Sequence, residues 1–150
     1  MLRYSSLLSS FKNKRILVVG DIILDRYIFG KVSRISPEAP VPVVEVLQES
    51  YRLGGAMNVA NNIVSLGGQA TIVGFIGKDY ESELLIAQCN KTGIGTSGVI
   101  RTSRATTVKT RIIAHTQQVV RVDREETSPF SKGNYQKLYE IFDKSALDYD

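Results

Sequence analysis

The hydrophobic pattern begins with a short apolar run and then changes to helical spacing. Residues 15–19 read RILVV, which predicts a short buried strand that ends at the following Gly20. Apolar residues at 56, 59, 60, 63 and 64 follow helical spacing, and Gly67-Gly68 predicts the end of that helix. A second buried strand is expected over residues 69–76. Strands that alternate with helices in this way predict an α/β fold with a parallel sheet.

The same rhythm continues downstream. Asp79 can cap a helix that runs to about Lys91 and ends at Gly93, and a further strand is expected from Val99. Apolar residues at 135, 138, 139 and 142 mark an amphipathic helix. The final Tyr149-Asp150 resembles the approach to another strand.

Two stretches of β pattern do not fit the alternation. Strands are expected over 27–32 and 41–47, and Pro40 and Pro42 at the start of the second favour an edge position. Residues 107–114 and 119–123 predict a hairpin around His115. We interpret these stretches as a small β sheet beside the main layer.

Composition narrows the classes of function. The net charge is +4 and the basic residues are scattered, which argues against nucleic-acid binding and is compatible with an anionic small molecule. Cys89 is the single cysteine, so no intramolecular disulfide can form, and a buried, inert thiol in a cytoplasmic protein is expected. The N-terminal apolar stretch is too short for a secretion signal, and no run approaches membrane-spanning length.

Gly54, Gly55 and Asn58 open the first helix without a Ser, Thr or Asp cap. The first N–H groups of the helix therefore lack a side-chain acceptor, and glycine lets a ligand approach the backbone closely. Asn58 adds a donor and an acceptor, the mixture that a polyol needs. The alternative is a glycine-rich turn in which Asn58 bonds its own backbone.

Asp21 and Asp25 follow the first strand at its carboxyl end, where open α/β sheets bind ligands. A carboxylate can accept two hydroxyl hydrogen bonds, which suits a vicinal diol. The alternative is that Asp21 caps a turn and Asp25 pairs with Arg26 or another surface cation.

In the predicted hairpin, strand alternation puts Lys109 and Arg111 on one face, where Arg121 can join them from the partner strand. Three cations on one face can hold a phosphate monoester, whereas the alternative is a solvated sheet face.

One further glycine pattern is misplaced for its usual role. Residues 93–98 satisfy G-x-G-x-x-G, but they follow a predicted helix and precede a strand, the reverse of a dinucleotide-binding loop. We therefore expect a helix stop and a turn. The single histidine, His115, is expected to be a turn residue, and no metal site is expected.

The run Gly54-Gly55-Ala56-x-Asn58-x-Ala60, followed by Gly67 and Gly77, resembles the first signature of the PfkB-type, ribokinase-like carbohydrate kinases. The opening Gly20 to Asp25 also resembles that family's first strand and its sugar-binding aspartate. The resemblance implies a ribokinase-like parallel sheet flanked by helices. It also implies a small β-sheet lid, over about 27–53 and 106–123, that closes over the sugar and makes a homodimer contact.

Within the family, Asp25-Arg26-Tyr27 and the segment 33–43 (SRISPEAPVPV) resemble the heptose 7-phosphate kinases. This resemblance implies ATP-dependent phosphorylation of the anomeric hydroxyl of D-glycero-β-D-manno-heptose 7-phosphate, in ADP-heptose synthesis for lipopolysaccharide. The implied sugar ligands are Asp25, Gly54, Gly55 and Asn58. The implied candidates for the 7-phosphate are Lys109 and Arg111, with Arg34 and Arg121 as further candidates.

The family's Gly-Ala-Gly-Asp-type catalytic motif and its ATP site, which uses Mg²⁺, lie further downstream and have no counterpart in these residues. We therefore expect a truncated, N-terminal part of the kinase fold that carries no catalytic residue and is inactive alone. Two alternatives stay open: another ribokinase-like sugar kinase, or a non-catalytic module that binds sugar phosphate or mediates dimerisation.

Overall fold

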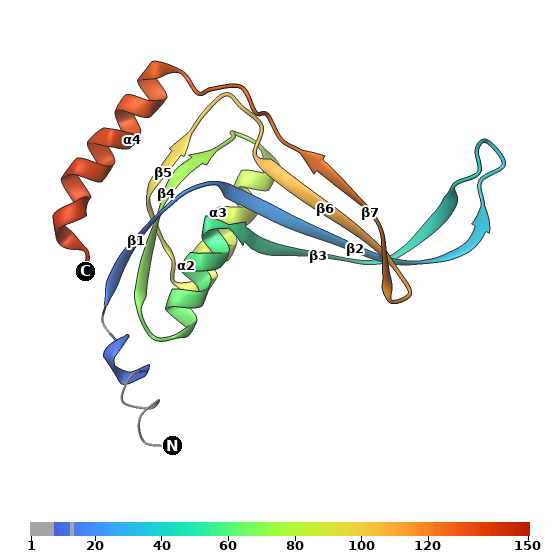
Figure 1. Cartoon of the computed structure of the whole chain (residues 1–150), viewed down its shortest axis with the longest axis horizontal. Coiled ribbons are helices and arrows are strands. Elements are labelled where there is room, and N and C mark those ends of the chain that lie inside the picture. The colour runs from blue at the N-terminus through green and yellow to red at the C-terminus, as the bar shows by residue number, and fades with distance from the viewer. Residues whose placement is uncertain (1–7, 13) are drawn as a thin grey trace.

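A parallel three-stranded sheet forms the centre of the main layer (Figure 1). The computed structural model describes residues 8–12 and 14–150. Strands β1 (Arg15–Val19), β4 (Gln69–Ile76) and β5 (Gly95–Arg101) lie in the order β1-β4-β5, and both pairings are parallel. The predicted α/β fold with a parallel sheet is confirmed.

Helices cover both faces of this sheet. Ile72 and Ile76 of β4 point to the face that packs on α2 (Ala56–Ser65) and α3 (Tyr80–Thr92). The alternate residue Phe75 makes an edge contact with Tyr135 of α4 (Lys132–Ser145), with ring centroids 6.2 Å apart. A 3₁₀ turn, Ala146–Asp148, follows α4. Coverage on both faces explains why the sequence of β4 is almost continuously apolar.

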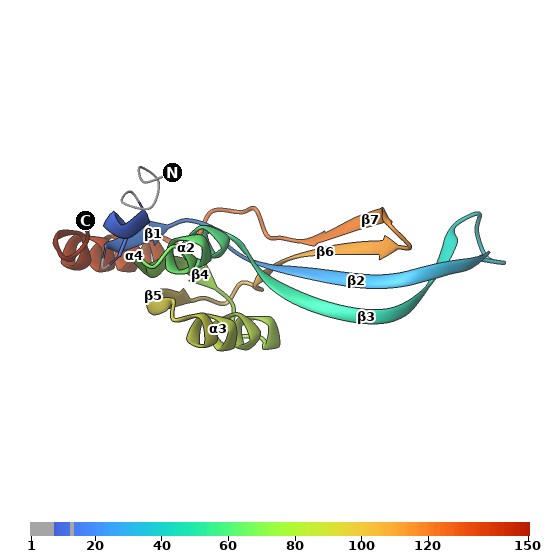
Figure 2. The same ribbon diagram turned by 90° about the horizontal axis from the view of Figure 1, so that it is seen from below.

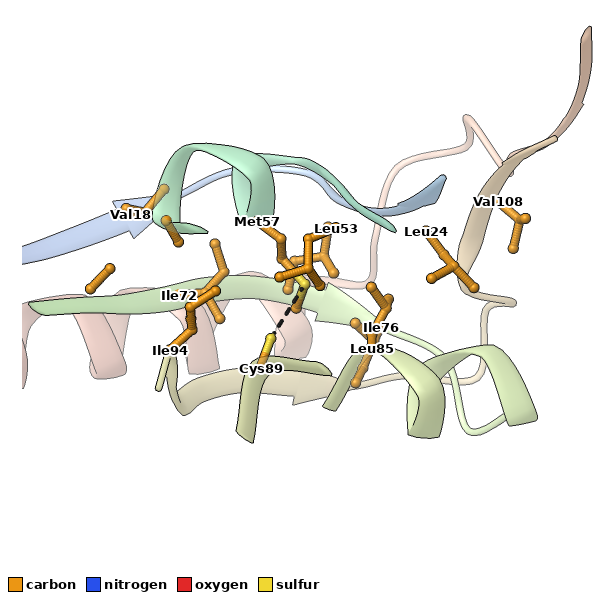
Figure 3. Close-up of a cluster of buried hydrophobic side chains, with 13 residues drawn as sticks. Val18, Leu24, Leu53, Met57, Ile72, Ile76, Leu85, Cys89, Ile94 and Val108 are labelled. Atoms are coloured by element: carbon orange, nitrogen blue, oxygen red, sulfur yellow. Dashed lines mark hydrogen bonds between the residues drawn. The ribbon is translucent and has the colours of Figure 1, made fainter. Parts of the chain in front are cut away.

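The hydrophobic core lies between the sheet and the two helices α2 and α3, and it extends beyond them to Leu24 and Val108 (Figure 3). Met57, Ile72 and Leu85 are fully buried, as is Cys89, whose Sγ lies 3.7 Å from the Sδ of Met57. Burial raises the pKa of the Cys89 thiol to about 11, so the thiolate is not formed at neutral pH. The predicted burial of the thiol is confirmed.

A second, four-stranded sheet projects from the main layer, and we call it the projecting sheet (Figure 2). Its strands are β2 (Ile22–Ile35), β3 (Pro42–Gly55), β6 (Thr107–Ala114) and β7 (Gln117–Arg124), in the order β3-β2-β6-β7. Strand β2 is antiparallel to β3 and parallel to β6, and β7 returns antiparallel to β6. The edge position predicted for the strand after Pro40 is confirmed.

Several strands are longer than the sequence predicted. The expected strands 27–32 and 41–47 are each 14 residues long in the structure, and β5 begins at Gly95 rather than Val99. The extra length of β3 is rich in polar residues, such as Gln48 and Glu49, and so carries no strong hydrophobic signal. It is extended because its backbone pairs with β2 almost to the end of the ribbon.

Asp79 joins the two sheets at the start of α3. Its carboxylate accepts hydrogen bonds from the Ser82 N–H at 2.9 Å, the Thr106 N–H at 2.8 Å and the Thr106 hydroxyl at 2.6 Å. Thr106 immediately precedes β6. Burial alone would raise the pKa of Asp79, but the hydrogen bonds from Thr106 and Ser82 outweigh it and hold that pKa below its usual value. The predicted helix cap is confirmed, and it also anchors the projecting sheet.

The final residues return to the start of β1. The Asp150 N–H donates to the Arg15 carbonyl at 2.8 Å, and the Asp150 carboxylate pairs with Lys14 at 2.7 Å. The last residues therefore lie beside the first strand. That they approach a further strand stays a prediction.

Candidate functional site

Asp25 lies on β2, just beyond the point where the chain leaves the main layer for the projecting sheet. Its Oδ1 accepts a hydrogen bond from Nη1 of Arg111 at 2.6 Å, and both side chains are half-buried. This bond raises the pKa of Arg111, against the opposing effect of burial. Of the alternatives for Asp25, the structure has the carboxylate paired with a cation, but that cation is Arg111 of β6 rather than the adjacent Arg26.

Gly54 and Gly55 each have a structural reason to be glycine. A Cβ on Gly54 would lie 2.7 Å from Oδ2 of Asp25, so the glycine leaves room for the carboxylate. Gly55 has a φ of +55°, and a Cβ there would meet the Asp21 carbonyl. The two glycines therefore shape the surroundings of the aspartates.

Helix α2 begins without a side-chain cap, as predicted, with Gly55 at the N-cap position. The Ala56 N–H donates to the Asp21 carbonyl at 2.9 Å, so Asp21 contributes through its backbone rather than its carboxylate. Asn58 is exposed and, within the described chain, has no hydrogen bond to its own backbone. Its amide is available to a ligand.

A cavity of about 370 Å³ lies between β3, α2 and α3, and it brings Asp25 and Asn58 together. Its walls are mostly polar, and Asp25 is the one carboxylate and Arg52 the one cation among its lining residues. The lining consists of Asp25, Tyr27, Tyr51, Arg52, Leu53, Asn58, Asn61, Gln88 and Thr92. A polar cavity with many donors and acceptors can hold a polyhydroxylated molecule.

Lys109, Arg111 and Arg121 share the face of the projecting sheet that carries Asp25. In the register, Lys109 is the neighbour of Asp25, and Arg111 lies between Tyr27 and Arg121. The predicted common face is therefore confirmed, but none of the three lines the cavity. Arg121 pairs with Asp123 at 3.0 Å on an exposed part of the sheet.

Arg34 does not join this group. It lies nine positions beyond Asp25 on β2, roughly 30 Å along the strand at about 3.3 Å per residue. Its register partner is Val43, near the far end of the β2–β3 ribbon. The sequence could not reveal this separation, because the strand is far longer than its hydrophobic pattern indicates.

Other residues of the cavity were not singled out from the sequence. Tyr27 and Arg52 are each two residues from Asp25 or Gly54, so strand alternation alone would have placed them on the same face. Asn61 is three residues after Asn58, on the same side of α2. No sequence pattern connects Gln88 and Thr92 of α3 to this site, because tertiary packing brings that helix here.

The remaining motifs behave as structural elements. Gly93 ends α3 with a φ of +80° and β5 follows from Gly95, so the G-x-G-x-x-G run is a helix stop and turn, as predicted. His115 has a φ of +55° at the tip of the β6–β7 hairpin. Among the described residues, no group of three or more His, Cys, Asp or Glu side chains is arranged to hold a metal ion. None of the described helices is long and apolar enough to cross a membrane.

A family model described as "pfkB family carbohydrate kinase" matches residues 13–147. A "Bifunctional protein HldE" from Helicobacter pylori (strain ATCC 700392 / 26695) is 48% identical over 138 residues, covering 91% of this chain and 30% of that protein. Another from Magnetococcus marinus is 50% identical over 118 residues, covering 78% of this chain and 24% of that protein. The chain thus spans about a third or less of these relatives.

Solved structures show the same fold at low identity. Phosphofructokinase-2 from Escherichia coli superposes with a TM-score of 0.68 at 18% identity, covering 88% of this chain and 41% of that chain. A sugar kinase structure from Clostridium perfringens superposes with a TM-score of 0.62 at 20% identity, covering 87% of this chain and 41% of that chain. The ribokinase-like α/β arrangement is therefore shared with proteins of very different sequence.

Proposed function

Because the chain belongs to the pfkB family of carbohydrate kinases, we propose that it supplies the sugar-binding part of a heptose 7-phosphate kinase. The reaction would transfer a phosphoryl group from ATP to the anomeric hydroxyl of D-glycero-β-D-manno-heptose 7-phosphate. The single observation that carries this proposal is the polar cavity where Asp25 and Asn58 meet. The resemblance of Asp25-Arg26-Tyr27 and of residues 33–43 to the heptose 7-phosphate kinases supports the choice of heptose over other sugars.

In this proposal the residues of the chain bind and orient the sugar. The free oxygen of Asp25 accepts a hydrogen bond from one hydroxyl, and the amide of Asn58 serves a second. Gly54 keeps space for the carboxylate, and Gly55 sets the start of α2. Lys109 and Arg111 lie on the face of Asp25 and make that face attractive to a phosphorylated sugar.

Among the described residues, no group of three or more His, Cys, Asp or Glu side chains is arranged to hold a metal ion by itself. In this proposal the ATP and Mg²⁺ that the family uses, and the catalytic base, are held mostly by residues other than those described here. The projecting sheet would act as the lid that excludes water from the sugar.

We also propose that two copies pair through the projecting sheet. Large apolar side chains are exposed on it, including Leu47 at 65%, Val46 at 54% and Val122 at 53%. Sedimentation equilibrium tests this pairing: wild type is expected as a dimer, and Leu47→Asp combined with Val122→Asp as a monomer. A monomeric wild-type chain would refute it.

The function is tested by replacing the matching 138-residue segment of the Helicobacter pylori relative with this chain. The chimera is expected to convert heptose 7-phosphate and ATP to the 1,7-bisphosphate, followed by ³¹P NMR, with the unaltered relative as control. Asp25→Asn in the chimera is expected to abolish turnover. Turnover of ribose or fructose phosphate in place of the heptose would assign another substrate within the family. The chain alone is expected to be inactive.

A further inference from the structure

The cations of the projecting sheet differ in whether a carboxylate already neutralises them. Four arginines are paired: Arg26 with Glu49, Arg111 with Asp25, Arg121 with Asp123 and Arg124 with Glu81. Arg34, Arg52 and Lys109 have no carboxylate partner among the described residues. Of these three, Arg52 is the one that lines the cavity.

The ring of Tyr27 fixes the position of Arg52. The Cζ atom of Arg52 lies 4.8 Å from the ring centroid, and the Cζ of Arg111 lies 5.3 Å from the same centroid. Arg52 and Arg111 come from β3 and β6, the strands on either side of β2. A guanidinium stacked on a ring keeps its N–H groups free at its edge, so Arg52 can hold a phosphate through two parallel hydrogen bonds.

The charges nearby favour an anion at this place. Arg52 and Lys109 flank Asp25 in the register, one on each side. Asp25 is neutralised by its 2.6 Å bond to Arg111, so it repels an incoming phosphate less than a free carboxylate would. The cavity walls on the other side are formed by neutral polar groups, those of Asn58, Asn61, Gln88 and Thr92. An anion in this cavity therefore meets one unpaired cation, Arg52.

We propose that Arg52 is the phosphate-binding, specificity-determining residue of the cavity, and that Tyr27 positions it. The proposal rests on the proposed function and places the phosphate of the bound sugar on the β3 side of Asp25. Lys109 lies on the β6 side and does not line the cavity. In this arrangement Arg111 serves chiefly to hold and neutralise Asp25.

Calorimetric titration of the whole chain with heptose 7-phosphate and with unphosphorylated heptose tests this proposal. Arg52→Gln is expected to weaken binding of the phosphate by roughly 10- to 100-fold, the range for a lost charged hydrogen-bond pair, with heptose changed less than about twofold. Lys137→Gln on α4 removes the same charge far from the cavity and is the matched control. Tyr27→Leu is expected to reproduce most of the loss, and Tyr27→Phe, which keeps the ring, to restore binding.

Equal weakening of both ligands by Arg52→Gln would overturn the specificity role. A phosphate-specific loss for Lys109→Gln that exceeds the loss for Arg52→Gln would overturn it too, because the phosphate would then lie on the β6 side. Either result leaves the proposed function standing, since the wild type still binds the sugar phosphate. A wild-type chain that binds neither ligand would overturn the proposed function, and this inference with it.

Discussion

The main layer and the projecting sheet are stabilised in different ways. In the main layer, α2, α3 and β4 bury Met57, Leu85 and Ile72 completely. In the projecting sheet, every residue of β7 is exposed, and large apolar side chains such as Leu47 face solvent. The main layer is thus stabilised by apolar burial, and the base of the projecting sheet shares in the same core through the fully buried Leu24. The outer part of the projecting sheet depends on backbone pairing and ion pairs. The candidate site lies where the two meet, so each region contributes a different kind of residue to it.

The largest expected effect comes from making the same substitution in both regions. Leu85→Ala removes a fully buried side chain from a helix, where alanine is favourable, and is expected to cost about 3–4 kcal/mol in the free energy of unfolding. Leu47→Ala, at a side chain that is 65% exposed, is expected to cost less than about 0.5 kcal/mol. Urea denaturation followed by circular dichroism measures both. Both variants are measured on protein dilute enough to be monomeric, because the proposed dimer would cover Leu47 and raise the cost of its removal. Similar costs in the monomer would mean that apolar burial stabilises both regions alike.

The next effect concerns the junction between the regions. Asp79→Ala removes the cap of α3 and leaves Thr106 and Ser82 without their acceptor, so it is expected to cost about 2–3 kcal/mol. Asp143→Ala on α4, an exposed aspartate, is expected to change the free energy of unfolding by less than about 0.5 kcal/mol.

The junction also predicts a pH dependence with a definite sign. The pKa of Asp79 is lower in the folded than in the unfolded chain, so its contribution is complete above the ordinary aspartate pKa. That contribution declines as the pH falls through the lowered pKa. The stability difference between wild type and Asp79→Asn, measured by urea denaturation at a series of pH values, is therefore expected to shrink on acidification. A difference that grows toward acid would contradict the assigned shift.

The two regions also differ in how far the sequence could predict them. The strands and helices of the main layer could be predicted from the spacing of apolar residues. Each of these elements buries at least one face, so its sequence carries a strong apolar pattern. The strand predicted from Val99 is present but begins at Gly95, because a glycine-rich strand start has a weak apolar pattern. The sequence also did not reveal the distance between Arg34 and Asp25, because the exposed end of the β2–β3 ribbon has a weak pattern. Asp25 and Asn58 were predicted from the residues and the family resemblance. Gln88 and Thr92 could not be, since only the packing of α3 brings them to the cavity.

A smaller effect is expected from replacing Gly54, which leaves room for the Asp25 carboxylate in the site. Gly54→Ala adds a Cβ 2.7 Å from the Asp25 carboxylate at a backbone conformation that alanine accepts. The carboxylate must move, which is expected to cost about 1–2 kcal/mol and to weaken sugar binding roughly tenfold. Gly133→Ala on α4, where a Cβ meets nothing within 4 Å, is expected to stabilise by up to about 1 kcal/mol. Unfolding and calorimetry on both variants separate local crowding from a general effect of replacing glycine.

The smallest expected effect comes from breaking an exposed ion pair of the projecting sheet, and it is compared with the effect of breaking a less exposed pair. Arg121 and Asp123 have 52% and 29% exposed side chains, and solvent screens such a pair, so Arg121→Gln is expected to change the free energy of unfolding by less than about 0.5 kcal/mol. Arg111→Gln leaves the less exposed Asp25 without its cation and is expected to cost about 1 kcal/mol or more. Urea denaturation at low and high salt measures both, and salt should reduce the Arg121 effect more than the Arg111 effect. Equal, salt-sensitive losses would mean that Asp25 is as well solvated as the sheet surface. The carboxylate would then be no better placed for a ligand than an ordinary surface residue.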